Sequence, residues 1–160
     1  MSKLLILAGV IIVAFWYFVS QEEIPNNEVT APIMNQEHTT NTDGVEYNSN
    51  PPTSGPHFPD WHKDWKFYET ALPTGGLLHN MEHGGVVVWY KSSVDDATKE
   101  QLKEFTEDNF KMIASVNEDI PAQMALSAWG VYELFDVFDE VKFKRFYKKH
   151  LNRAPENVYP

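Results

Sequence analysis

The sequence predicts an α+β domain in which two helices cover one face of a single small mixed sheet. Two kinds of segment alternate along the chain: short runs of β-branched and aromatic residues, and longer segments with apolar residues at helical spacing. With 160 residues, of which 42% are hydrophobic, the chain has room for one domain with a real core. A long ordered loop region and an N-terminal transmembrane anchor helix are expected to precede the sheet.

The N-terminus is predicted to be a membrane anchor, residues 1–20. The run "LLILAGVIIVAFWYFV" at 4–19 is apolar and uncharged, and Lys3 precedes it. As a helix it would reach roughly 24 Å, which is short for a hydrocarbon core of about 30 Å. A cleaved signal peptide is the alternative, but "WYFVSQ" is bulky where cleavage needs small residues. We expect a single-pass cell-membrane protein, held through residues 4–19, with its C-terminal part outside the cytoplasm.

Two segments without periodicity follow. The first, residues 21–44, is polar and is predicted to form a tether. Residues 45–160 are predicted to form the extracytoplasmic domain, which begins with the second of these segments. Residues 45–65, "VEYNSNPPTSGPHFPDWHKDW", are rich in turn formers. This stretch should nevertheless be ordered, because four large aromatic side chains need packing partners: Tyr47, Phe58, Trp61 and Trp65.

The predicted elements then run strand, helix, strand, strand, helix. Residues 84–90, "GGVVVWY", are typical of a buried strand. Residues 92–110 read as a helix capped by Ser93 or Asp95, with Leu102 and Phe105 on its apolar side. Residues 111–116 and 122–135 are each predicted to be a strand. Residues 139–152 form a second amphipathic helix, and its inward residues are predicted to be Val141, Phe143, Phe146 and Tyr147.

Composition excludes several functions. The net charge of −10 argues against nucleic acid as a partner, because phosphate binding needs a basic face. The chain has no cysteine, which removes disulfides, thiolate metal sites and thiol nucleophiles. A metal ion would have to be bound by histidine, carboxylate, methionine or backbone groups.

The stretch "LLHNMEHGG" at 77–85 carries the strongest chemical signal, and its sequence fits two local structures. On a helix, His79, Glu82 and His83 share one face in the order H-x-x-E-H, as in zinc proteases whose glutamate is the general base. On a strand, His79, Met81 and His83 share a face, a softer set suited to copper. Because glycine pairs flank the motif and "VVVWY" follows directly, the sequence favours a loop leading into a strand.

His57 is a third candidate ligand. It is the last residue of "PPTSGPH", a loop shaped by prolines and a glycine. The prolines restrict the unfolded chain, so ordering this loop costs less conformational entropy. Such a loop can present one imidazole, although a hydrogen bond to a backbone carbonyl would explain His57 equally well. His62 and His150 are interpreted as surface residues rather than ligands.

Four ordered blocks resemble a known family: "YNSNPPTSGPH", "LLHNMEHGGVVVWY", "ALSAWG" and "FYKKHLNRAPE". The family is domain of unknown function 3105, and the resemblance covers about residues 38–156. It implies a short membrane-anchored or exported domain and supplies no established activity. The family's polar signature maps onto five residues of this chain: His38, His57, His79, Glu82 and His83.

The resulting hypothesis is a mononuclear metal site. His57, His79 and His83 are the predicted ligands, with His38 or a methionine as the fourth. Copper is the preferred ion and zinc the alternative. The domain would then handle metal or assist assembly at the membrane, where a membrane protein is a candidate partner. Two rival functions stay open: a zinc hydrolase with Glu82 as base, and a metal-free protein-interaction domain. Whether the protein is an enzyme is left open.

Overall fold

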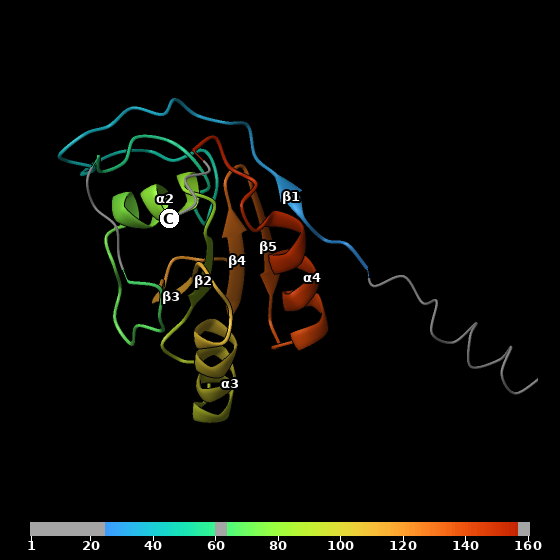
Figure 1. Ribbon diagram of the computed structural model, residues 1–160. Coiled ribbons are helices and arrows are strands. Elements are labelled where there is room, and N and C mark those ends of the chain that lie inside the picture. The colour runs from blue at the N-terminus through green and yellow to red at the C-terminus, as the bar shows by residue number, and fades with distance from the viewer. Residues whose placement is uncertain (1–24, 60–63, 157–160) are drawn as a thin grey trace, which may run out of the picture.

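The computed structural model describes residues 25–59 and 64–156, and it confirms an α+β fold built on one open mixed sheet (Figure 1). The strands lie in the order β1-β5-β4-β2-β3. Strands β2 and β3 are parallel, and the other neighbours are antiparallel. The strands are β1 (Val29–Thr30), β2 (Val86–Tyr90), β3 (Met112–Val116), β4 (Met124–Ala128) and β5 (Val131–Phe135). The helices are α2 (Thr74–Glu82), α3 (Asp96–Glu107) and α4 (Glu140–His150).

Strand β2 lies inside the sheet, and all five of its residues are buried. Successive side chains of a strand point to opposite faces, so β2 contributes to two cores. Val86, Val88 and Tyr90 pack with the apolar residues of α3 and α4. Val87 and Trp89 pack on the other face with the apolar residues of α2. The continuous apolar run at 86–90 therefore reflects burial on both faces, as is usual for a covered strand.

Helices α3 and α4 cover one face, as predicted. The Asp95 side chain accepts a hydrogen bond from the Thr98 N–H at 3.0 Å and caps α3. In α4, Phe143 and Phe146 are fully buried, but Val141 is 58% exposed. The prediction that Val141 points inward is wrong, because it lies two residues before Phe143 and so faces away from the phenylalanine side of the helix.

The opposite face is covered by α2 together with the long loop, and here the prediction needs correction (Figure 1). Residues 74–82 are helical, not a loop leading into a strand. Leu77, Leu78 and Met81 lie on the sheet side of α2 and are fully buried. Loop residues Tyr47 and Trp65 pack against the same core. Trp61 lies outside the described residues.

The predicted strand 122–135 is two strands. β4 and β5 form an antiparallel hairpin, with Ala128 paired to Val131. Trp129 and Gly130 make the turn, and Gly130 has φ +76°. A glycine adopts this left-handed conformation at little cost, which allows the chain to reverse inside an apolar run.

The segment predicted as a tether contributes to the sheet. Within it, β1 pairs with β5 at the sheet edge, and Ala31 is buried. The Glu28 carboxylate contacts Lys149, and its Oε2 lies 3.2 Å from His150 Nε2. The sequence did not indicate this strand, because two residues are too few to show a period. None of the helices in residues 25–59 and 64–156 has the length and hydropathy of a membrane span, and residues 4–19 lie outside the described part.

The Glu28 contacts predict a pH dependence of stability. Burial alone would raise the pKa of the Glu28 carboxyl, but hydrogen bonds from Lys149 and His150 outweigh it and lower that pKa. Between the folded and unfolded pKa values the unfolded chain binds more protons, so stability falls as pH drops from about 4.3 through the folded pKa. Denaturant unfolding of wild type and Glu28→Gln at pH 3–7 should show a shallower loss for the variant. If wild type and Glu28→Gln lose stability in parallel over this pH range, the contribution assigned to the Glu28 carboxyl is contradicted.

Candidate metal centre

The end of α2 positions two of the polar side chains. The backbone N–H of Gly84 donates to the Met81 carbonyl at 2.9 Å, and that of Gly85 donates to the Asn80 carbonyl at 3.0 Å. With φ +86° at Gly84, this is the Schellman ending of a helix. The pair of glycines was therefore a helix stop signal rather than the start of a strand. His79 and Glu82 lie three residues apart in the last turns of α2, hence on one face.

The C-terminal segment secures this helix end. The Glu156 N–H donates to the Glu82 carbonyl at 3.1 Å, and the Asn152 N–H donates to the Gly84 carbonyl at 2.8 Å. The Lys111 ammonium donates to the His83 carbonyl at 3.0 Å, and burial lowers the pKa of Lys111. Because the last carbonyls of a helix have no partners within it, these bonds satisfy groups that would otherwise need water.

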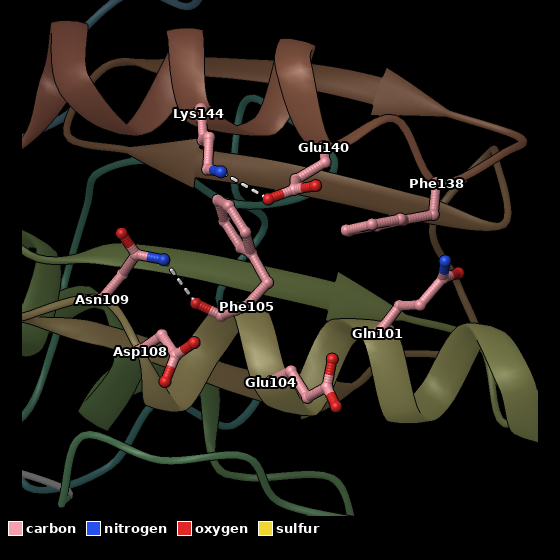
Figure 2. A pocket seen from close by; sticks show the side chains of 8 residues that line it. All are labelled: Gln101, Glu104, Phe105, Asp108, Asn109, Phe138, Glu140 and Lys144. Atoms are coloured by element: carbon pink, nitrogen blue, oxygen red, sulfur yellow. Dashed lines mark hydrogen bonds and ion pairs between the residues drawn. The ribbon is translucent and has the colours of Figure 1, made fainter.

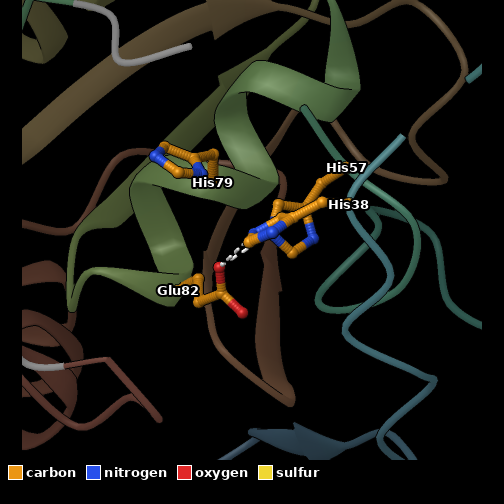
Figure 3. Close-up of side chains that lie close together, drawn as sticks. All are labelled: His38, His57, His79 and Glu82. Carbon is orange, nitrogen blue, oxygen red and sulfur yellow. Dashed lines mark hydrogen bonds and ion pairs between the residues drawn. The ribbon is translucent and has the colours of Figure 1, made fainter. Parts of the chain in front are cut away.

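Two loop segments present the other histidines. His38 and His57 form an isolated parallel bridge. The Thr39 N–H donates to the His57 carbonyl at 2.8 Å, and the His57 N–H donates to the Glu37 carbonyl at 3.0 Å. This pairing holds the two histidines side by side above the end of α2 (Figure 3).

The four side chains converge on one point. His38, His57, His79 and Glu82 each offer one ligand atom, and these four atoms all lie within 4.8 Å of one another. Glu82 Oε2 is 2.7 Å from His57 Nε2 and 3.5 Å from His38 Nε2 (Figure 3). His57 and Glu82 are almost completely buried, whereas His38 is 43% exposed at its side chain. The cluster could hold a metal ion, with an approach from the His38 side.

The hydrogen bonds of His57 orient it as a ligand. Its Nδ1 lies 2.8 Å from the Gly55 carbonyl oxygen, which can only accept, so Nδ1 carries a proton. In the neutral ring Nε2 then has a lone pair, and this lone pair faces the Glu82 carboxylate. Two acceptors at 2.7 Å need a proton or a cation between them. A backbone carbonyl that receives the second ring N–H is the arrangement typical of metal-binding histidines.

Trp129 closes one side of this site. Its ring meets that of His57 edge to face, with the centroids 5.9 Å apart. The aromatic side chain lies at the β4–β5 turn and reduces the access of water to the His57–Glu82 pair. Low access strengthens electrostatic attraction between an ion and its ligands.

The structure changes the predicted ligand set. His38, His57 and His79 come together, but His83 belongs to a different group with Glu82 and Glu156. Met81 is fully buried and its sulfur accepts a hydrogen bond from the Ser127 hydroxyl at 3.2 Å, so it belongs to the core. On a helix, residue 81 points away from residues 79 and 83, which removes the soft strand-type set.

The remaining histidines lie elsewhere. His150, the last residue of α4, contacts Glu28, and burial lowers the pKa of the His150 imidazole despite this carboxylate. Its side chain is 14% exposed, so the interpretation of His150 as a solvated surface residue is wrong. His62 lies outside the described residues.

Two pockets are separate from the histidine cluster. One, of about 380 Å³, lies between α3 and α4 and combines the rings of Phe105 and Phe138 with exposed acidic side chains (Figure 2). The other, of about 520 Å³, is lined by the loop around Tyr47 and by residues 116–119. Neither is lined by a histidine, so neither extends the candidate metal centre.

Comparison with known families assigns the chain. It matches the family described as "Protein of unknown function (DUF3105)" over residues 38–160. The chain belongs to this family. The matched region contains all four residues of the cluster, from His38 to Glu82. Comparisons with curated proteins and with solved structures gave no match.

Proposed function

We propose that this DUF3105 domain binds a divalent transition-metal ion through His38, His57, His79 and Glu82. The observation that carries the proposal is the convergence of one donor atom from each of these four residues, all within 4.8 Å of one another. A single proton would join only His57 and Glu82, whereas a cation would be shared by all four donors. Ligands on a tetrahedral ion at about 2.0–2.1 Å lie roughly 3.3 Å apart, so small side-chain shifts would admit the ion.

The donor set supports copper(II) or zinc rather than copper(I). Copper(I) is selected by thiolate and thioether ligands, and the thioether of Met81 is part of the core. Imidazole suits both divalent ions, and the general affinity order of divalent metals places copper(II) above zinc. Copper therefore remains the preferred ion of the proposal and zinc the alternative.

The position of Glu82 supports metal binding over hydrolysis. Its Oε2 lies among the imidazole nitrogens, at 2.7 Å from one and 3.5 Å from another. A general base in a zinc hydrolase acts on a metal-bound water from outside the ligand set. Here the carboxylate is in the place of a ligand. We propose a role in metal handling outside the cytoplasm; the apolar run at 4–19 with Lys3 before it supports that location.

The test is metal titration of the full-length chain, purified with mild detergent and stripped by a chelator. Wild type is expected to bind Cu²⁺ and Zn²⁺ at this site, and His38→Ala and His79→Ala are expected to weaken the tightest site more than about 100-fold. This expectation exceeds the 10–100-fold loss seen when only an outer partner of a ligand is removed. His150→Ala, a histidine away from the cluster, is the control and should bind as wild type does. Wild-type protein that binds neither ion would contradict the proposal and leave the metal-free interaction domain.

A further inference from the structure

A second group of donors adjoins the first. Glu82, His83 and Glu156 offer ligand atoms that all lie within 4.8 Å of one another. Glu82 belongs to both groups, and the rings of His79 and His83 touch edge to face with centroids 4.6 Å apart. The two groups are therefore neighbours that share one carboxylate.

Backbone contacts hold this second group together. The Glu156 N–H donates to the Glu82 carbonyl at 3.1 Å, which brings a residue 74 positions away beside α2. His83 is the C-cap of α2, and its carbonyl accepts from Lys111. The three donors thus come from one helix end and from the segment bound to it.

We propose that the protein binds a second divalent transition-metal ion between Glu82, His83 and Glu156, with the Glu82 carboxylate bridging the two ions. This inference rests on the proposed function of the first site. A carboxylate has two oxygens and can bind one ion with each. Paired sites of this kind place their ions about 3.5–4 Å apart.

Distances and charge support the second ion. His83 Nε2 and Glu156 Oε2 are 3.8 Å apart, too far for a hydrogen bond. Two ligands on one tetrahedral ion are separated by roughly 3.3 Å, so an ion fits between them after a small shift. Glu82 and Glu156 are like charges, and a cation between them removes their repulsion.

The second site differs from the first in its access to solvent. The side chain of His83 is 18% exposed and that of Glu156 is 51% exposed, whereas His57 is fully buried. Three protein donors leave a position open on a four-coordinate ion. That position faces solvent, and it would accept water or a small oxyanion.

The test counts ions in the full-length, metal-free protein titrated with Zn²⁺, with elemental analysis after gel filtration. Wild type should retain two Zn²⁺ per chain. Glu156→Ala and His83→Ala should each retain one, while Glu100→Ala, an exposed glutamate on α3, should retain two. Far-ultraviolet circular dichroism checks that each variant is folded.

A copper experiment gives a second readout. Two bridged Cu²⁺ ions couple magnetically, so the fully loaded wild type should show less paramagnetic resonance intensity than two isolated ions. Glu156→Ala should show the spectrum of one isolated Cu²⁺.

Each outcome decides the inference. One ion in wild type that Glu156→Ala and His83→Ala also retain overturns the second site and leaves the proposed function intact, whereas no ion in wild type overturns both. Two ions retained in both Glu156→Ala and His83→Ala would place the second ion elsewhere and overturn this assignment.

Discussion

Replacing His57 by alanine is expected to lower the free energy of unfolding of the metal-free protein by about 3–5 kcal/mol, the cost typical of breaking a buried ion pair. Without metal, a proton must lie between His57 Nε2 and the Glu82 carboxylate, which are 2.7 Å apart. That carboxylate is 2% exposed in the wild type, and the substitution removes its closest partner. The measurement is denaturant unfolding of the full chain with chelator present.

The double variant His57→Ala with Glu82→Ala serves as the control. Removing both partners leaves no buried charge, so its loss should be smaller than the sum of the two single losses by about 1–3 kcal/mol. Additive losses, or a His57→Ala loss of less than about 1 kcal/mol, would show that the pair does not stabilise the fold. Saturating Zn²⁺ should stabilise wild type and leave the double variant unchanged, because only a ligand that binds the folded state stabilises it.

Phe143→Ala is expected to cost about 3–5 kcal/mol, as large-to-small changes at buried phenylalanines do. The Phe143 ring is fully buried and contacts three other rings, with centroids 4.7–5.6 Å away. These rings belong to Phe105, Phe135 and Phe138. The cavity would open between α4, α3 and the sheet, where the surrounding rings relax only in part.

Val141→Ala on the same helix is the matched control. Its side chain is 58% exposed, and surface substitutions usually change stability by less than about 0.5 kcal/mol. Thermal or urea unfolding of both variants gives the comparison. Equal losses would mean that α4 does not pack through its phenylalanine face.

Elements with strong periodicity were predictable from the sequence. The apolar run at 86–90 indicates a strand that is buried on both faces. The apolar stripes of 92–110 and 139–152 each specify one buried side of a helix. The α+β class and the mixed sheet followed from their order. Val141 was misassigned because valine is apolar wherever it lies, and position on the helix decides its burial.

The helix at 74–82 was missed because its signals conflict. Gly75 and Gly76 lower helix propensity, and Gly84 fits the start of the predicted strand at 84–90 although glycine also ends helices. What decides the helix is tertiary: Leu77, Leu78 and Met81 bury against the sheet, and most helical stability in proteins comes from such packing. The hairpin of β4 and β5 was missed for a related reason, since one Gly in an apolar run gives little warning of a turn.

The sequence by itself determined that a metal site, if present, must use histidine, carboxylate, methionine or backbone groups, because the chain has no cysteine. The resemblance of its sequence blocks to the family marked His38, His57, His79, Glu82 and His83 as the polar candidates. Only the tertiary structure decided which of these residues lie together in one group of metal donors. The helical turn sends Met81 into the core, the loop pairing sets His38 beside His57, and the C-terminal segment brings Glu156 to His83. These contacts join residues far apart in the chain, and no local pattern encodes such distances.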